Sequence, residues 1–298
     1  MSDLNSKTSG LLHLTHAEIK KRISRQRLFG IKEVQDYLFK ICQEMLNANS
    51  SRLQDFSFYD LAPSVLLYGP PNTGKTSLSY YLFDRIKNEV TNEINFYTVD
   101  VGRMLDPSLG QSSRNLEQIF EDLKKVCQKG SSVFLLLDEL DTFCMSRSRI
   151  NEHDAIRRSM TTLMMELDKL HPSTTTKFLI FGITNVPELV DTAVVRRFSL
   201  KKNIDPQLSL DEFQSYLTYL NQSIKYELKQ DKLENLYKIY LNRQFTVGDI
   251  KALYKVLYLD LMCDNIILYK DDHLLKLFES GFSTKEHLSK TYIKELIN

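Results

Sequence analysis

The most informative stretch of this chain reads Gly69-Pro70-Pro71-Asn72-Thr73-Gly74-Lys75-Thr76, with Ser77 directly after it. It fits the pattern G-x-x-x-x-G-K-[ST], in which glycines let a short loop turn its backbone N–H groups toward an anion. An apolar run at residues 65–68 precedes the loop and a helical pattern follows it, so the loop joins a strand to a helix N-terminus. We therefore expect all nine residues to bind the phosphates of a nucleotide rather than to form an ordinary Gly/Pro turn.

Two side chains of this loop suit a nucleotide and its metal ion. Lys75 is expected to reach the β- and γ-phosphates, and the Thr76 hydroxyl is expected to bind Mg²⁺. Asn72 stands where many such loops carry glycine, and Asn tolerates positive φ better than most residues. The sequence therefore predicts binding of ATP with Mg²⁺ in spite of that difference.

A second motif lies downstream, where an apolar run at residues 133–137 ends in Asp138 and Glu139. A parallel strand that is covered on both faces needs such an apolar run. At its carboxyl end, Asp138 is placed to hold Mg²⁺ through water, and Glu139 to accept a proton from the attacking water. Two adjacent acids also suit a solvated turn, but their place downstream of the phosphate-binding loop favours the catalytic interpretation.

The pattern along the chain predicts an α/β domain followed by a helical one. Short apolar runs alternate with longer helical patterns up to Pro206, which is typical of a parallel sheet flanked by helices. The five expected strands are 65–68, 96–100, 133–138, 177–184 and 200–204, and the expected helices are 76–89, 114–128 and 154–170. Beyond Pro206 only helices are expected, at 210–221, 231–242, 247–262 and near 284–297, forming a small lid domain. We expect three parts: an N-terminal segment 1–26, helical from about Thr15, the α/β domain 27–206 and the lid 207–298.

Composition narrows the classes of function. Of 298 residues 42% are hydrophobic and 26% charged, which is ordinary for a globular protein, and 39 Lys plus Arg nearly balance 38 Asp plus Glu. This balance gives no reason to expect nucleic acid or an anionic membrane as the main partner. The four cysteines lie far apart, without Cys-x-x-Cys spacing, and no apolar run is long enough to span a membrane. We therefore expect a soluble, cytoplasmic protein.

With both motifs in place, residues 28–262 resemble the AAA subgroup of the AAA+ P-loop ATPases. Residues 182–198, which read G-I-T-N-V-P-E-L-V-D-T-A-V-V-R-R-F, are similar to the family's G-x-T-N-x-P-x-x-x-D-x-A-x-x-R-R-F stretch. The resemblance implies that Asn185 is a sensor that hydrogen-bonds the attacking water or the γ-phosphate. It implies that Arg196 and Arg197 are arginine fingers reaching the next subunit's site, and hence a ring, expected to be a homohexamer. The absence of an Asn-Lys-x-Asp motif argues against a GTPase.

Two further segments are assigned through this resemblance. Residues 245–250 are similar to the family's F-[ST]-G-A-D-I at the start of a lid helix, which places Gly248 near the nucleotide, although Val247 replaces the usual glycine. Residues 28–30 resemble an adenine-covering turn, in which only Gly30 matches well.

The segment 106–112 resembles the loop with which such rings grip polypeptide. Ser108 occupies the aromatic position, which leaves Leu109, beside Gly110, as the one sizeable apolar contact. The resemblance therefore implies a weak grip and brief remodelling of a partner rather than long threading. The alternative is an ordinary surface loop with no substrate role.

The expected function is ATP hydrolysis in an oligomeric ring that remodels or disassembles a partner protein. In layout the chain resembles small bacterial AAA ATPases and remodellers of HORMA-domain proteins. The alternative is a nucleotide-dependent switch or scaffold that controls an effector protein without threading it, which Ser108 favours. A DNA-dependent motor is disfavoured by the net charge of +1.

Overall fold

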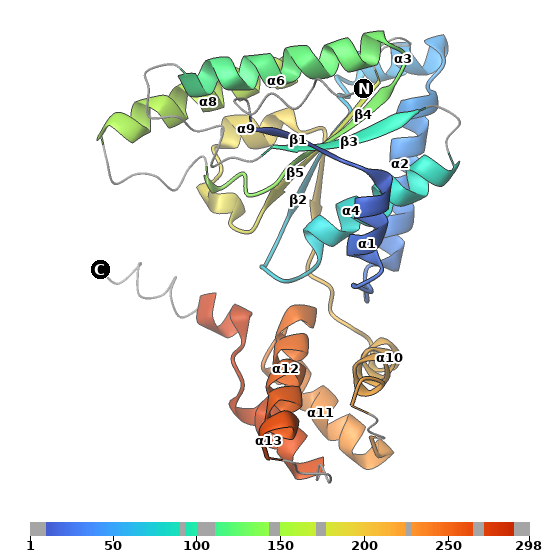
Figure 1. Cartoon of the computed structure of the whole chain (residues 1–298), viewed down its shortest axis with the longest axis vertical. Coiled ribbons are helices and arrows are strands. Elements are labelled where there is room, and N and C mark those ends of the chain that lie inside the picture. The colour runs from blue at the N-terminus through green and yellow to red at the C-terminus, as the bar shows by residue number, and fades with distance from the viewer. Residues whose placement is uncertain are drawn as a thin grey trace. The chain divides into compact units, whose positions relative to one another are not determined.

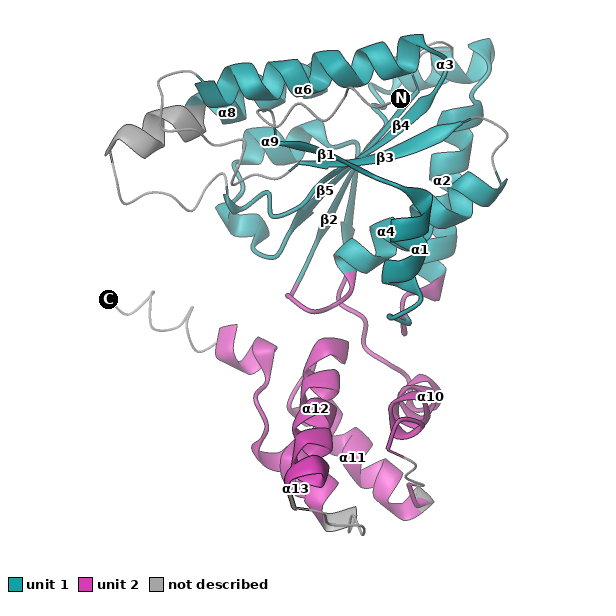
Figure 2. Ribbon diagram, in the orientation of Figure 1, with its two compact units in different colours: residues 1–27, 33–69, 75–203 teal, residues 28–32, 70–74, 204–298 magenta. Residues whose placement is uncertain are grey.

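The computed structural model describes residues 10–89, 93–99, 111–142, 150–170, 177–224, 228–264 and 271–288 (Figure 1). By their contacts the residues fall into two compact units (Figure 2). The first unit comprises residues 1–27, 33–69 and 75–203, and the second comprises 28–32, 70–74 and 204–298. The predicted ATP-binding loop therefore contributes to both units, because its central residues 70–74 pack with the helical one.

The first unit is built on a six-stranded sheet whose strand order is β1-β3-β4-β5-β2-β6. Its strands are β1 Leu11–Leu14, β2 Ser64–Tyr68, β3 Ile94–Val99, β4 Ser132–Leu137, β5 Phe178–Thr184 and β6 Leu200–Asn203. All five predicted strands are present and parallel to one another. The prediction of a five-stranded, wholly parallel sheet was wrong in one respect, because β1 adds an antiparallel strand beside β3 at the sheet edge.

The extra strand is short because a helix begins directly after it. The Thr15 hydroxyl accepts a hydrogen bond from the backbone N–H of Glu18, and the Glu18 carboxylate accepts one from the Thr15 N–H. This capping box fixes the start of α1, His16–Ile23, where the sequence predicts a helix. Four residues, of which only Leu11 is buried, give too little alternation to be recognised as a strand.

Helices cover both faces of the sheet (Figure 1). They are α2 Lys32–Asn47, α3 Ser50–Phe58, α4 Lys75–Glu89, α6 Gln111–Gln128, α8 Ile150–Asp168 and α9 Thr192–Arg197. Side chains alternate between the faces, so Val133 and Leu135 of β4 join the core with α6 and α8. Phe134 points to the other face, where it stacks on Phe181 at 4.7 Å and meets Phe83 of α4 edge-on at 5.8 Å.

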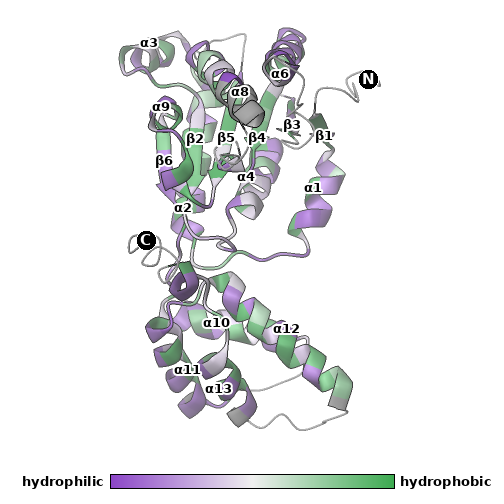
Figure 3. Cartoon of the chain, turned by 90° about the vertical axis from the view of Figure 1, so that its left-hand side faces the viewer, coloured by the Kyte–Doolittle hydropathy of each residue, from purple (hydrophilic) through white to green (hydrophobic). Residues whose placement is uncertain are grey.

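The central strands β4 and β5 are mostly apolar, as Figure 3 shows by hydropathy, with Ser132 at the start of β4 and Thr184 at the end of β5 as their hydroxyl-bearing residues. Every residue of β4 and β5 is buried. This matches the expectation for parallel strands covered on both faces.

The second unit contains the helices α10 Leu210–Asn221, α11 Gln230–Asn242, α12 Val247–Asp264 and α13 Asp271–Ser280. The first three lie where the sequence predicts them, whereas α13 was not predicted. Of the helix expected near 284–297, residues 284–288 are helical and the remainder lies outside the described part. The core of this unit is aromatic, with Phe213 stacked on Tyr240 at 5.0 Å and edge-on to Phe278 at 6.3 Å.

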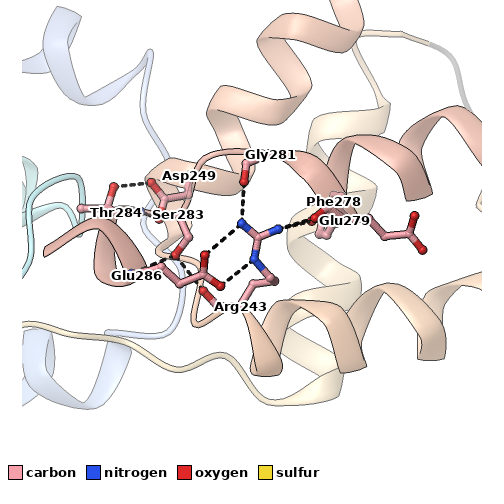
Figure 4. Close-up of polar contacts among 8 residues, drawn as sticks. All are labelled: Arg243, Asp249, Phe278, Glu279, Gly281, Ser283, Thr284 and Glu286. Atoms are coloured by element: carbon pink, nitrogen blue, oxygen red, sulfur yellow. Dashed lines mark hydrogen bonds and ion pairs between the residues drawn. The ribbon is translucent and has the colours of Figure 1, made fainter. Parts of the chain in front are cut away.

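Arg243, at the end of α11, binds the segment that follows α13 (Figure 4). Its Nε and Nη2 donate to the two carboxylate oxygens of Glu286, at 2.6 and 3.0 Å. Its Nη groups also donate to the carbonyl oxygens of Phe278, Glu279 and Gly281. One guanidinium therefore holds both the end of α13 and the turn beyond it.

Asp249 fixes the same segment to the first turn of α12 (Figure 4). Its carboxylate accepts hydrogen bonds from the N–H of Thr246 at 2.8 Å and the N–H of Thr284 at 3.2 Å, and from the Thr284 hydroxyl. Asp249 and Thr284 are both buried. The segment 281–286 is thus held against the first turn of α12 through Thr284.

Within the described residues, no helix has the length and apolar character needed to cross a membrane.

Candidate nucleotide-binding site

Three neighbouring strands bring the predicted site residues to one edge of the sheet. In the parallel pairs, Tyr68 lies opposite Thr184 and Leu137 lies opposite Gly182. The predicted loop that follows β2, the two acids that follow β4 and Asn185, which follows β5, therefore all leave the sheet at its carboxyl edge. Ligands of open α/β sheets bind at this edge.

The loop of residues 69–76 has a tightly turned backbone. Gly69, Asn72 and Gly74 have positive φ angles of 130°, 62° and 93°. Asn72 thus adopts the left-handed conformation in which we expected Asn to be tolerated. The Thr73 hydroxyl donates to the carbonyl of Pro70 at 3.0 Å, which closes the turn from within.

Lys75 bends back over the loop that it terminates. Its side chain is 4% exposed, and Nζ donates to the carbonyl oxygen of Gly69 at 2.8 Å. A buried ammonium is costly unless it is paired with acceptors. The loop supplies one such acceptor, and phosphate oxygens would supply stronger ones.

Thr76 and Asp138 form an oxygen pair suited to a hard cation. The Thr76 hydroxyl donates to Oδ2 of Asp138 at 2.9 Å, and Oδ1 of Asp138 accepts from the Glu139 N–H at 2.9 Å. Mg²⁺ takes oxygen ligands and usually keeps several waters, so it needs only one or two protein oxygens beside the phosphates. The donor set therefore fits Mg²⁺.

Nearby on α4, burial raises the pKa of Tyr80, and the Asp138 carboxylate adds to the rise.

Glu139 begins a tight turn at the end of β4. Its φ is 56°, a left-handed value that is uncommon for a residue with a long side chain. The Thr142 N–H donates to the Glu139 carbonyl at 2.9 Å, and the Leu140 N–H donates to the carbonyl of Ile183 at 2.8 Å. Leu140 is buried while Glu139 is exposed, so the turn keeps the carboxylate accessible to water.

The two predicted finger arginines lie at the end of α9 in different surroundings. Nε of Arg197 donates to Oδ1 of Asp168, on α8, at 2.8 Å, and its Nη1 donates to the carbonyl of Ala193 at 2.8 Å. Arg196 is exposed and makes no hydrogen bond or ion pair with any residue that the structure describes. The Arg197 guanidinium is therefore engaged within its own chain, and that of Arg196 is not engaged by any described residue.

Two predicted glycines of the site make close contacts inside the second unit. A Cβ on Gly248 would lie 2.2 Å from the Cβ of Asn72, so only glycine lets the start of α12 approach the loop this closely. A Cβ on Gly30, whose φ is +70°, would lie 2.6 Å from the side chain of Leu208. Both glycines thus pack against protein, and Gly248 packs against the loop itself.

Two further predicted residues lie in α4 and directly after β5. Ser77 is half-buried in the first turn of α4, and its hydroxyl donates to Oε1 of Gln26. Asn185 is half-buried directly after β5. The predicted substrate loop with Ser108, Leu109 and Gly110 lies outside the described residues.

Sequence reasoning missed two buried polar residues at this edge, Asp141 and Thr184. Thr184 is fully buried and Asp141 is 8% exposed, and the two are hydrogen-bonded. A hydroxyl at the end of an otherwise apolar strand was the signal that could have identified Thr184. For Asp141, the one available signal in the sequence was its position two residues after Glu139.

A match to a protein family covers this edge of the sheet. The family model described as "ATPase family associated with various cellular activities (AAA)" matches residues 65–206, which contain the loop, the two acids and both arginines. Residues 65–206 are an AAA domain.

Curated relatives match part of this chain. Spastin of Ixodes scapularis is 26% identical over 234 residues, which are 76% of this chain and 33% of the relative. Vacuolar protein sorting-associated protein 4A of Homo sapiens is 33% identical over 134 residues, 45% of this chain and 28% of the relative. "AAA ATPase forming ring-shaped complexes" of Corynebacterium diphtheriae is 29% identical over 168 residues, 53% of this chain and 33% of the relative. The chain spans about a third of the length of these relatives.

Solved structures with the same fold extend over more of the chain than the AAA domain. A chain of the E. coli MS115-1 HORMA:CdnC:Trip13 complex matches with a TM-score of 0.74 at 18% identity, over 92% of this chain and 95% of that one. Rhizobiales Trip13 matches with a TM-score of 0.65 at 16% identity, over 92% and 98%. This likeness confirms the predicted fold, an AAA P-loop NTPase domain followed by a helical unit.

Proposed function

We propose that this chain hydrolyses ATP with Mg²⁺ and works as a ring, expected to be a homohexamer, that remodels or disassembles a partner protein. The observation that carries the ATPase proposal is the grouping of buried Lys75, the Thr76–Asp138 oxygen pair and exposed Glu139 at one edge of an AAA domain. The cytoplasm is the proposed place of action.

Each residue of the group has a distinct part in the proposed reaction. The N–H groups of the loop and Lys75 hold the phosphates, while Thr76 and Asp138 hold Mg²⁺. When bound, the metal neutralises charge on the phosphate oxygens. Glu139 accepts a proton from the attacking water, and Asn185 orients that water.

The ring part of the proposal rests on α9 and on the relatives. Arg196 is free to reach a site on a neighbouring copy, whereas Arg197 must first leave Asp168. A cation supplied in this way stabilises the charge that spreads over the transferring phosphoryl group. One relative is named for forming ring-shaped complexes.

The partner-remodelling part is supported by the solved structure in which a Trip13 protein is found in a complex with HORMA and CdnC. By analogy, a folded protein is the proposed substrate class, and nucleic acid is not. The second candidate is a switch or scaffold that does not thread its partner. Ser108 at the position of the gripping aromatic favours it, because a serine buries little apolar area against a polypeptide.

The test of the activity uses the purified full chain, ATP and Mg²⁺. The unmodified protein should release phosphate, and Glu139→Gln should bind ATP as tightly while releasing almost none. ATP-loaded Glu139→Gln should also retain a partner from a lysate of its own source, identified by mass spectrometry against a Lys75→Ala control. If phosphate release is equal in the two proteins, Glu139 is not the base and the proposed mechanism is wrong.

Leu109→Ala separates the two candidate functions. A remodeller should lose action on the retained partner while its basal phosphate release persists. A switch that does not thread should keep its nucleotide-dependent binding of the partner.

A further inference from the structure

Asp141 and Thr184 are two buried residues outside the proposed catalytic set, and their side chains are hydrogen-bonded to each other. The Thr184 hydroxyl donates to Oδ1 of Asp141 at 3.0 Å, and it accepts from the backbone N–H of Val186 at 3.1 Å. Thr184 is 0% exposed and Asp141 is 8% exposed. The hydroxyl therefore donates one hydrogen bond and accepts another, and the two bonds fix its orientation.

These bonds connect the two turns that carry the proposed catalytic groups. Asp141 lies two residues after Glu139, and Asn185 lies between Thr184 and Val186. A parallel backbone bond, from the Leu140 N–H to the Ile183 carbonyl at 2.8 Å, joins the same turns one residue earlier. The turn after β4 and the turn after β5 are thus held together at two adjacent points.

The chemistry of this pair is costly if its only task is to fill space. A carboxyl group taken out of water loses solvation, and the bond from the Thr184 hydroxyl repays only part of that loss. Two apolar side chains of similar size would pack at the same place without that cost. A directional bond does what apolar packing cannot, because it fixes one turn relative to the other in distance and angle.

We propose that Asp141 and Thr184 are positioning residues for ATP hydrolysis, which hold the Glu139 carboxylate and the Asn185 amide so that both address one water. The inference rests on the proposed function. Displacing such groups by about 1 Å costs on the order of 100-fold in rate, so a loss of this alignment should reduce turnover far more than nucleotide binding.

The main test variant is Thr184→Val, which keeps the shape of the side chain and removes both hydrogen bonds. Thr184→Ser restores the hydroxyl, and Asp141→Asn keeps an acceptor oxygen opposite it. Thr162→Val is the matched control, since Thr162 is a buried threonine, 7% exposed, that belongs to α8 and to neither turn. Each variant is measured for ATP affinity, for single-turnover hydrolysis under saturating ATP, and for thermal stability.

We expect Thr184→Val to slow single-turnover hydrolysis by about 10- to 100-fold while the ATP dissociation constant stays within about twofold. Thr184→Ser should recover most of the rate, and Asp141→Asn should lie between them. Introduced into Glu139→Gln, Thr184→Val should add little further loss, because residues that act as a unit are not additive.

Other results overturn the inference. One is a Thr184→Val protein that is less stable but hydrolyses ATP at the unmodified rate, as a purely structural role requires. Another is an equal loss of rate in Thr162→Val. If Thr184→Val does not fold, the other two variants decide. A slower single-turnover rate in Asp141→Asn than in Thr184→Ser supports the inference, and equal, unmodified rates in both overturn it. If Glu139→Gln itself hydrolyses ATP normally, the proposed function fails first, which separates that failure from this one.

Discussion

Lys75 and Glu139 are two charged residues at one edge of the sheet with opposite exposure. Lys75 is buried over its own loop and Glu139 stands in solvent. A buried cation that can meet phosphate oxygens and an exposed carboxylate that can accept a proton from water are what the proposed phosphoryl transfer requires of these two positions.

The first prediction concerns Lys75. Lys75→Ala should weaken ATP binding by at least about 100-fold, because a buried charge-assisted contact with the phosphates is lost. Lys75→Met should weaken binding equally, yet it should leave the melting temperature unchanged or higher, since a buried ammonium is replaced by an apolar chain of similar length. Titration calorimetry and thermal unfolding measure the two effects. Tight ATP binding by either variant would contradict the role given to Lys75.

At this scale, sequence predicts what is local along the chain. The loop and the Asp138–Glu139 pair were found because each is a continuous motif beside a strand. The bond between Thr184 and Asp141 joins residues 43 positions apart, so no local pattern contains it. The roles given to the loop, Asp138, Glu139, Asn185 and the two arginines remain predictions.

At the scale of elements, α9 carries two arginines with separate tasks. The second prediction is that Arg197→Ala lowers the melting temperature slightly, since the Arg197–Asp168 ion pair is partly exposed and contributes at most about 1 kcal/mol. Arg196→Ala should leave the melting temperature unchanged and reduce turnover severely, because its contact forms only with the transition state in a neighbouring site. Thermal unfolding and steady-state hydrolysis distinguish the two. If Arg196→Ala retains full turnover at a protein concentration where rings form, Arg196 is not a finger.

The third prediction concerns the segment that follows α13. Arg243→Met should destabilise the second unit by roughly 2 kcal/mol or more, since Glu286 and three carbonyl groups lose a charged donor. Arg52→Met is the matched control, because Arg52 pairs with Glu44 at 3.8 Å on the surface. Denaturant unfolding measures both. A similar small change in the two variants would show that the Arg243 contacts contribute little.

Elements were predicted best where they are long and repeat the hydrophobic pattern. Helix α10 was predicted to the residue, and β4 and β5 stand out as continuous apolar runs. Strand β1 was missed because four residues beside a capped helix show no period, and its pairing partner β3 is more than 80 residues away. Helix α13 was missed although its buried residues Leu274 and Phe278 have helical i, i+4 spacing, because ten residues are a short window for a periodic signal.

At the scale of the whole molecule, the proposed enzyme is complete only as an assembly. The fourth prediction is that Arg196→Ala and Glu139→Gln, each inactive alone, recover part of the turnover when mixed. Some sites in a mixed ring then combine an intact Glu139 with an Arg196 from the neighbour. Specific activity of the unmodified protein should likewise rise with concentration as rings assemble. A mixture as inactive as its components, together with activity independent of concentration, would refute shared sites.

The order of the two units along the chain could be predicted, and their full membership could not. The change from alternating strands and helices to helices alone placed the predicted boundary after Pro206, and by contacts the last segment of the second unit begins at Ile204. Residues 28–32 and 70–74 belong with the helical unit through contacts such as Gly248 with Asn72. Such contacts depend on how distant segments pack, which a linear pattern does not encode.

The left-handed backbone at Glu139 has a consequence for attempts to make this protein more thermostable. A long side chain in that conformation costs about 1 to 2 kcal/mol, which glycine would not incur. The fifth prediction is that the melting temperature of Glu139→Gly equals or exceeds that of the unmodified protein, while phosphate release stops. The free energy of unfolding should rise by up to about 1 kcal/mol. A lower melting temperature would show that the turn does not oppose the native residue. A library selected only for heat resistance should therefore enrich inactive clones at this codon, so such a screen must reward turnover as well as survival.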